Sequence, residues 1–313
     1  MAALLASGGR YRVVWLVEES FLPLVKYHPA VDEAIPVASK RWRKRWALPE
    51  TGKEVHAVLK AIHQRAPSIA VDPQGLVKSA LWAALAGVPH RLGFSLSHRR
   101  ERLAGLFYTQ RVTPPSQLSH VVDFNLALAQ PLVGNVIFGI SPDASFLRAH
   151  LPQPPREAKA VLLLPGSGNV KKNWAPACFA ELARSLLAQG WPVTVVWGPG
   201  EREVAAAIAR EAPGCQLAPP TDLWQLASWL NAALAVIGGD TGPVHLAASM
   251  GVPTVALHLA TDPKRNCPRG ARVAVVSGAR QDRALRRART GPTRSIAPGE
   301  VLQAFQELMR GSV

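Results

Sequence analysis

The residues best suited to chemistry lie in a glycine-rich segment in the second half of the chain, residues 237–245. The apolar run that ends at Ile237 predicts a strand, and Pro243 suits the first position of a helix. The N–H groups at a helix start have no partner within the helix, and the helix dipole is positive there. Glycines also let a ligand approach the backbone closely. The segment therefore predicts a binding site for a diphosphate.

Three side chains of this segment can add specific contacts. Asp240 and Thr241 directly precede the expected helix, and His245 lies in its first turn. Thr241 offers a hydroxyl donor, and the His245 ring can reach a phosphate oxygen. In the simpler alternative, Asp240 and Thr241 only cap the helix, as such residues often do. The segment alone does not separate these two interpretations.

A second glycine loop favours the ligand-binding interpretation. The apolar run 160–164 predicts a buried strand that leads into the glycine-rich residues 166–168, and Lys171 and Lys172 follow. In an open α/β sheet, the loops at the carboxyl ends of the strands line one crevice. We therefore expect both loops to face one anionic ligand.

A parallel sheet is needed to position these loops, and the pattern of the second half predicts one. Continuous apolar runs alternate there with stretches of helical spacing, which is typical of strands covered on both faces. The expected strands are 160–164, 192–197, 234–237 and 254–257, and the expected helices are 179–187, 201–211, 223–231, 243–250 and 298–309. The first half is similar, with expected strands 13–17 and 68–71 and helices 52–65 and 76–86. The fold class predicted for the whole chain is α/β.

Length and composition indicate two domains and an anionic partner. A chain of 313 residues exceeds the usual size of one hydrophobic core. Residues 140–159 are rich in Pro, Ser and Ala and lack periodicity, so we expect a linker there and domains at 1–145 and 146–313. The net charge of +15 suits a nucleic acid, a membrane surface or a phosphorylated substrate.

Other patterns concern the cellular compartment. The three cysteines have no CxxC spacing, which predicts neither a disulfide framework nor a zinc site. The apolar stretches are too short to span a bilayer, and no signal-peptide pattern opens the sequence. These features predict a cytoplasmic protein.

The segment around Asp240 resembles the donor-site signature of glycosyltransferase family 9, the lipopolysaccharide heptosyltransferases. The similarity runs through residues 239–254 and 261–263, and residues 165–168, 172–174 and 197–198 resemble the family's other donor-site motifs. In the first half, residues 17–19, 41–44, 72–79 and 106–108 are similar to the heptosyltransferase I branch of the family. The resemblance covers residues 13–278.

This resemblance implies a GT-B fold, in which two Rossmann-like domains face a central cleft. It also implies an inverting transfer of L-glycero-D-manno-heptose from ADP-heptose to Kdo of the lipopolysaccharide inner core, with no metal or other cofactor. By position, the donor-binding residues of the C-terminal domain are Ser167, Gly168, Lys172, Glu201, Asp240, Thr241, Gly242 and His245. The acceptor-binding residues of the N-terminal domain are Arg41, Arg43, Lys44, Lys78, Arg100 and His120.

The acceptor-binding residues would contact the carboxylate of Kdo and the phosphates of lipid A. They would also hold the enzyme at the inner face of the inner membrane. Residues 41–46 mix cations with tryptophans, and their alternative role is a solvated basic surface. The tryptophans at positions 174, 191, 224 and 229 are expected to pack in the core. Neither a nucleic acid nor a stable protein partner is expected.

An inverting transfer needs a general base that takes the proton of the acceptor hydroxyl. In the family this base is an Asp in a Gly-Asp loop after the first strand of the N-terminal domain. Residues 13–17 match the family's second strand, so we expect the N-terminal sheet to lack its first strand. The catalytic residue of this chain is therefore unknown. Glu18, Glu19 and Asp72 are candidate substitutes, and Asp72 is also suited to a strand-end cap.

Two alternatives to heptose transfer follow from these considerations. A chain without the Asp loop is expected to bind ADP-sugar but to be inactive or very weak, as a non-catalytic or fragmentary sugar-nucleotide-binding protein would be. A family member that uses another nucleotide sugar would carry the same phosphate-binding residues.

Overall fold

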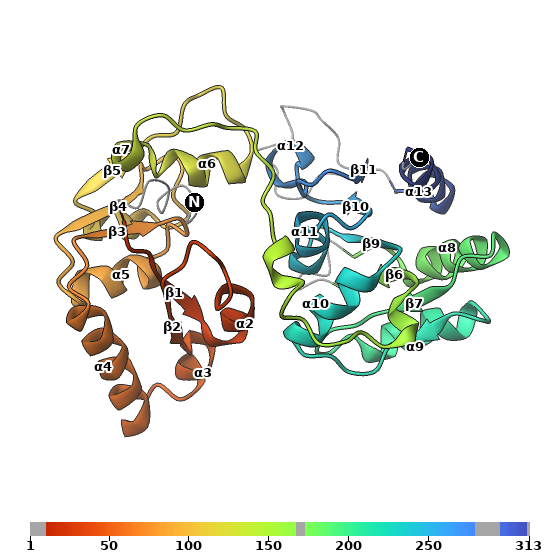
Figure 1. Cartoon of the computed structure of the whole chain (residues 1–313), viewed down its shortest axis with the longest axis horizontal. Coiled ribbons are helices and arrows are strands. Elements are labelled where there is room, and N and C mark those ends of the chain that lie inside the picture. Colours follow the sequence, from red (N-terminus) through yellow and green to blue (C-terminus); the bar gives the residue numbers. More distant parts are fainter. Residues whose placement is uncertain (1–10, 167–172, 279–294, 312–313) are drawn as a thin grey trace. The chain divides into compact units, whose positions relative to one another are not determined.

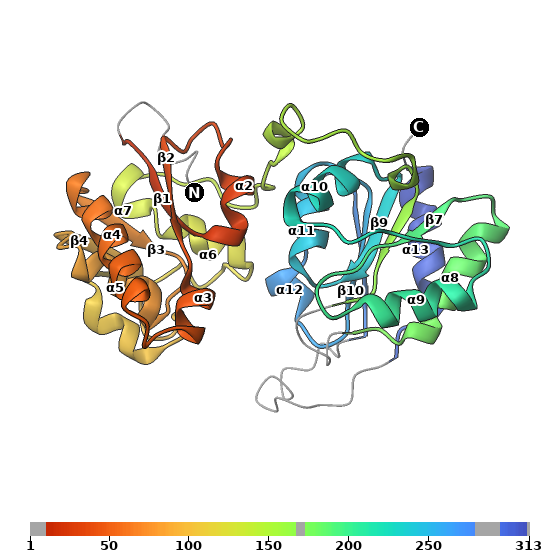
Figure 2. The same cartoon turned by 90° about the horizontal axis from the view of Figure 1, so that it is seen from below.

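The computed structural model describes residues 11–166, 173–278 and 295–311. The chain divides into two compact units, residues 1–139 and 140–313, and each contains parallel strands and helices (Figures 1 and 2). The predicted α/β class is therefore confirmed. The division falls earlier than the predicted boundary at 145, because the Ala144 N–H donates to the Ser249 carbonyl (2.9 Å) and ties this segment to the second unit.

The second unit contains a six-stranded parallel sheet in the order β11-β10-β9-β6-β7-β8. Its strands are β6 (Val161–Leu164), β7 (Val193–Val195), β8 (Gln216–Leu217), β9 (Ala235–Gly239), β10 (Thr254–His258) and β11 (Val273–Ser277). Every residue of β6, β9 and β10 is buried, as their continuous apolar runs predict. The sequence did not predict β8 and β11, which form the two edges.

Helices cover both faces of this sheet. One face carries α8 (Pro176–Ala188), α9 (Arg202–Glu211) and α13 (Pro298–Arg310), and the other carries α10 (Leu223–Ala232) and α11 (Gly242–Ser249) (Figures 1 and 2). A short helix, α12 (Pro263–Asn266), follows β10. Phe179, Ile237 and Phe305 are fully buried members of one core cluster beneath α8 and α13. This core holds the carboxyl ends of the strands in place.

In the first unit, the described strands form two separate parallel sheets. One sheet pairs β1 (Val14–Glu18) with β2 (Glu33–Val37), and the other has the order β3-β4-β5, with β3 (Ile69–Asp72), β4 (His90–Phe94) and β5 (Gln110–Val112). The expected interruption of this sheet is confirmed for the residues that the structure describes, since no ladder joins β1 to β3.

Along the sequence, most helices of the first unit connect one of its strands to the next. They are α2 (Leu22–Val25), α3 (Ser39–Lys44), α4 (Pro49–Gln64), α5 (Val77–Leu85), α6 (Val121–Ala127) and α7 (Gln130–Val133). The predicted helices 52–65 and 76–86 are confirmed as α4 and α5 within a few residues. No helix in the described ranges is long and apolar enough to cross a bilayer.

Candidate functional site

The strand order of the second unit reverses between β6 and β9. From β6 the chain proceeds outward through β7 and β8, and from β9 it proceeds outward in the opposite direction through β10 and β11. Such a reversal leaves a crevice at the carboxyl ends of the two central strands, where open α/β sheets bind ligands. Leu164 and Gly238 are paired at these ends, so the segments that follow β6 and β9 flank the same point.

A glycine at position 238 lets helix α11 lie close to the two central strands. A Cβ atom at this position would lie 2.8 Å from the Leu164 Cβ and 3.0 Å from the Val244 Cγ2. Both distances are shorter than an ordinary carbon–carbon contact of about 3.5–4.0 Å. Gly238 therefore sets how near the start of α11 comes to the crevice.

The start of α11 presents unsatisfied donors. Thr241 occupies the cap position, but its side chain makes no capping hydrogen bond. The Thr241 carbonyl accepts the N–H groups of Val244 (3.1 Å) and His245 (3.2 Å). Among the described residues, neither the Gly242 N–H nor the Thr241 hydroxyl has a hydrogen-bond partner. A Cβ on Gly242 would meet no atom within 4 Å, so this helix start is open to an anion.

Asp240 and His245 are paired with each other. The His245 Nε2 lies 2.9 Å from the Asp240 Oδ1, and the Asp240 side chain is only 9% exposed whereas that of His245 is 37% exposed. The Thr241 side chain does not cap the helix, although Thr241 occupies the cap position. Asp240 holds the orientation of the His245 ring beside the open helix start.

Glu201 lies beside the loop that follows β6. Its carboxylate accepts the Gly198 N–H (2.8 Å), and a Cβ on Gly166 would lie only 1.8 Å from its carboxyl carbon. The lack of a side chain at Gly166 thus makes room for this carboxylate at the carboxyl ends of β6 and β7. The structure thus brings Glu201 and Gly166 together. Ser167, Gly168, Lys171 and Lys172 lie outside the described residues.

The segment 41–46 divides into an internal part and an exposed part. Trp42 is buried, packs against Trp82 (5.7 Å between ring centroids) and donates its Nε1–H to Glu54 (2.5 Å). Arg41 makes ion pairs with Glu54 (2.9 Å) and Glu19 (3.3 Å). The hydrogen bond from Arg41 lowers the pKa of Glu54, and the same carboxylates raise the pKa of Arg41. Arg41 is therefore engaged within the protein.

Beyond Arg41 the side chains are exposed. Residues Arg43, Lys44, Arg45, Trp46 and Leu48, which we call the α3–α4 patch, join the two helices at the surface. Trp46 is 81% exposed and Leu48 is 46% exposed. The three cations of the patch make none of the ion pairs formed among the described residues. The patch therefore combines positive charge with apolar area on the segment that connects α3 to α4.

The remaining expected acceptor residues have different environments. Lys78 in the first turn of α5 and Arg100 are both exposed. Their loops adjoin, since the Glu101 N–H donates to the Gly75 carbonyl (3.0 Å). The structure corrects the expectation for His120, which is only 4% exposed. Its Nδ1 accepts the Val122 N–H (3.2 Å) at the start of α6, so His120 caps a helix rather than presenting a surface cation.

Asp72 is a structural cap at the end of β3, as its position predicted. Its carboxylate accepts hydrogen bonds from the backbone N–H groups of Gln74 (2.9 Å) and Gly75 (3.3 Å) and from the hydroxyls of Ser79 (2.9 Å) and Tyr108 (2.6 Å). Burial, together with this hydrogen bond, raises the pKa of Tyr108. The sequence marked Tyr108 only as part of the family-like segment 106–108, because no local pattern links it to Asp72.

The other candidate carboxylates are also engaged. Glu18 accepts the Ser39 hydroxyl and the Lys40 N–H, and Glu19 pairs with Arg41. The packing role expected for the tryptophans is confirmed for Trp174 and Trp229, which are buried. No group of three or more metal-ligating side chains occurs among the residues that the structure describes.

A parallel sheet with an open helix start at its reversal point is an arrangement at which open α/β proteins bind anionic ligands. The sequence matches glycosyltransferase family 9 (heptosyltransferase) over residues 55–292. It is 34% identical to lipopolysaccharide heptosyltransferase 1 of Pseudomonas aeruginosa, covering 80% of this chain and 70% of that protein. It is 32% identical to lipopolysaccharide heptosyltransferase 1 of Escherichia coli K12, covering 80% of this chain and 78% of that protein.

The fold is similar to solved structures of the same family. The structure of E. coli heptosyltransferase WaaC with ADP has a TM-score of 0.80 and 27% sequence identity, covering 98% of this chain and 93% of that one. The chain belongs to glycosyltransferase family 9. It is a transferase by family, has the α/β architecture of GT-B glycosyltransferases, and is homologous to enzymes that transfer heptose in lipopolysaccharide core synthesis.

Proposed function

We propose that the protein binds ADP-heptose as the donor for an inverting transfer of L-glycero-D-manno-heptose to Kdo of the lipopolysaccharide inner core. The observation that carries the donor assignment is the open start of α11, where the Gly242 N–H and the Thr241 hydroxyl have no partner among the described residues. Similar structures of WaaC contain ADP and ADP-2-deoxy-2-fluoro heptose, which supports an ADP-sugar as the ligand.

In this proposal, the start of α11 binds the diphosphate. Negative charge builds up on the diphosphate as its bond to the sugar breaks, and fixed N–H donors with a positive helix dipole stabilise that charge. The Asp240–His245 pair borders the same position, and Lys172 and Ser167 supply further phosphate contacts. No metal is needed, because these groups offset the charge of the leaving ADP.

Glu201 is proposed to bind the ribose. One carboxylate oxygen accepts the Gly198 N–H, and the second, which accepts no hydrogen bond from the described residues, would accept a ribose hydroxyl. The carboxylate lies beside Gly166 at the adjoining strand end, within the same crevice as the start of α11. Gly166 has no side chain that would fill the position of this carboxylate.

Calorimetric titration tests the donor site. Wild-type protein is titrated with ADP, ADP-heptose and UDP-glucose, and Thr241→Val and Asp240→Ala are compared with it. Thr241→Val removes one hydrogen bond to a charged ligand, which is worth about 1.5–3 kcal/mol, so a loss of about tenfold or more in ADP affinity is expected. Asp143→Ala is the matched control, because that carboxylate accepts the Ser145 N–H (2.8 Å) in a connecting segment.

Either of two results would contradict the donor proposal. The first is unchanged ADP affinity in both site variants. The second is a preference for UDP-glucose over the ADP-sugars, which would keep the phosphate site but change the donor.

The α3–α4 patch, together with Lys78 and Arg100, is proposed to bind the anionic groups of Kdo-lipid A and to hold the enzyme at the inner face of the inner membrane. Each Lys or Arg near an anionic membrane surface contributes about 1 kcal/mol, and an exposed tryptophan suits the headgroup region. Trp46 and Leu48 supply apolar area beside the cations Arg43 and Lys44.

Vesicle flotation tests the membrane proposal. Wild-type protein should float with vesicles that contain anionic phospholipid and not with neutral vesicles. Trp46→Ser and Arg43→Glu should each reduce the bound fraction, whereas Leu85→Ser, which alters an apolar side chain that is 60% exposed on α5, should not. Equal binding by all three variants would reject the patch as the contact surface.

A further inference from the structure

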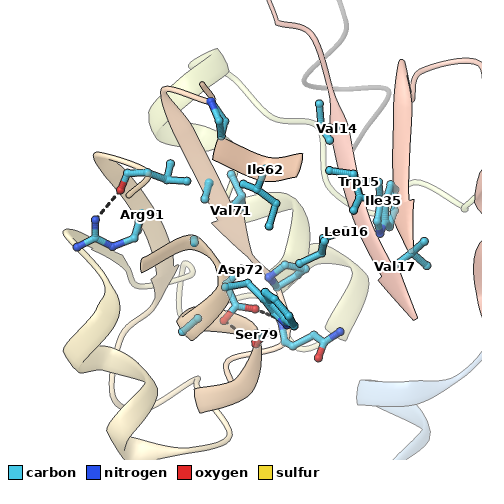
Figure 3. A pocket seen from close by; sticks show the side chains of 18 of the residues that line it. Val14, Trp15, Leu16, Val17, Ile35, Ile62, Val71, Asp72, Ser79 and Arg91 are labelled. Carbon is cyan, nitrogen blue, oxygen red and sulfur yellow. Dashed lines mark hydrogen bonds between the residues drawn. The ribbon is translucent and has the colours of Figure 1, made fainter. Parts of the chain in front are cut away.

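The two sheets of the first unit border a half-open cavity between their inner edges. Its volume is about 550 Å³, and its lining includes every residue of β1 and of β3 (Figure 3). Leu16 from β1 and Ile62 from α4 extend into this space, and Val71 lies on the opposite strand (Figure 3). The middle of the cavity is apolar, while charged side chains such as Arg65 and Asp72 lie in its lining at the two ends of β3.

The strands on either side of the cavity run in the same direction. Arg65, four residues before β3, forms an ion pair with Glu33 at the start of β2, and Arg12, just before β1, also pairs with Glu33 (3.6 Å). The starts of β1, β2 and β3 therefore meet at one end of the unit. Because β1 and β2 are parallel, β3 runs parallel to both.

Among the described residues, no strand pairs with the backbone groups of β1 and β3 that face the cavity. The Val13 carbonyl accepts the Glu33 N–H (3.3 Å), and in a parallel ladder alternate residues direct their backbone groups to the same neighbour. Val14 and Leu16 therefore direct their N–H and C=O groups away from β2. By the same rule, the bond from the His90 N–H to the Ser68 carbonyl (3.3 Å) means that Ile69 and Val71 direct theirs away from β4.

The second unit shows what fills the corresponding position in an uninterrupted sheet. From the edge strand β8 to the edge strand β11, neighbouring strands of this sheet are the third, second, first, fourth, fifth and sixth in the sequence of the unit. The first unit has the order β2-β1, the cavity, then β3-β4-β5, which is the same arrangement with the cavity at the position of β6. β6 is buried along its whole length, whereas every residue of β3 is only partly buried.

We propose that this cavity binds one extended, apolar polypeptide strand, parallel to β1 and β3, which joins the two sheets into a single six-stranded sheet. Both edges would hydrogen-bond to the inserted strand, so the slot recognises backbone as well as apolar side chains. The slot is independent of the proposed donor site, because all of its lining residues lie between positions 11 and 132.

A synthetic peptide tests the proposal on the full chain. The probe has the sequence of residues 159–166, which contains β6, with terminal lysines for solubility. Saturable binding should raise the temperature of thermal unfolding and slow hydrogen exchange at the amides of both Leu16 and Val71. ADP titration of the same samples should be unchanged.

Two N-methylated peptides distinguish insertion from simpler binding. In the second unit, Val161 of β6 bonds toward β7 and Ala160 bonds toward β9, so alternate residues face opposite neighbours. One probe is methylated at positions 161 and 163 and the other at 162 and 164. Since each set removes two backbone donors from one edge, both peptides should bind about tenfold or more weakly than the parent.

The binding of the three peptides either supports or overturns the insertion of a strand. Weakening by both methylated sets, with protection of both strands, supports an inserted strand. Loss with only one set would show pairing at a single edge and overturn insertion. Equal binding of all three peptides would mean that the cavity takes apolar ligands without strand pairing, and the absence of saturable binding would reject the proposal outright.

Discussion

Gly166→Ala is expected to weaken nucleotide binding by displacing Glu201. The new Cβ would lie 1.8 Å from the Glu201 carboxyl carbon and 2.0 Å from both carboxyl oxygens. Since carbon atoms in contact are separated by about 3.5–4.0 Å, the carboxylate must move by roughly 2 Å. The 2.8 Å hydrogen bond from the Gly198 N–H cannot survive such a shift.

The expected magnitudes differ for folding and for binding. The free energy of unfolding should fall by only about 1 kcal/mol, because a flexible side chain can turn into solvent and one hydrogen bond is lost. ADP affinity should fall about tenfold, which corresponds to about 1.4 kcal/mol for a lost ribose contact. Calorimetry with ADP and thermal unfolding measure the two quantities separately.

A double-mutant cycle tests whether the effect passes through Glu201. If it does, Gly166→Ala should add little to the affinity loss of Glu201→Ala, because the two changes remove the same contact. Glu203→Ala is the control, since this neighbouring carboxylate on α9 is 84% exposed and pairs only with Arg202 (3.2 Å) among the described residues. Fully additive losses would refute the reasoning and indicate a direct clash between the new methyl group and the nucleotide.

Three further results are expected. Gly238→Ala should lower the free energy of unfolding by about 1–3 kcal/mol, since its Cβ would lie 2.8 Å from the Leu164 Cβ. Gly242→Ala is the control, because a Cβ at that position faces open space and should not lower the free energy of unfolding. Equal denaturation curves for the two variants would contradict this prediction. The hydrogen bond from Arg65 lowers the pKa of Glu33 from 4.5, so its carboxylate stabilises the fold above pH 4.5 and this contribution disappears as the pH falls through the lower folded pKa. Glu33→Gln should therefore lower the melting temperature at pH 7 and lose this effect in strong acid, and a pH-independent difference would argue against the ion pair. ADP binding should be unchanged by EDTA, and an affinity that falls with the chelator and returns with Mg²⁺ would show that a metal takes part.

Most strands with continuous apolar runs were predicted from the sequence, whereas the apolar edge strand β11 and the strands with polar or interrupted runs were not. β6 and β9 are apolar throughout and were expected within one or two residues. β2 contains Pro36, which lacks a ladder donor and argues against a strand. β4 contains Gly93, which is required because a Cβ there would lie 2.2 Å from the Tyr108 ring. That contact exists only after β4 and the following loop have come together.

The sequence by itself determined the parallel α/β class, the glycine turn into α11 and the resemblance to a family of glycosyltransferases. These depend on apolar periodicity and on turn chemistry, which act over a few neighbouring residues. Only the tertiary structure placed Glu201 beside Gly166, bound Tyr108 to Asp72 and buried His120 at a helix start. Each of these joins side chains or strands that meet only through sheet assembly and packing, so no local pattern could reveal them.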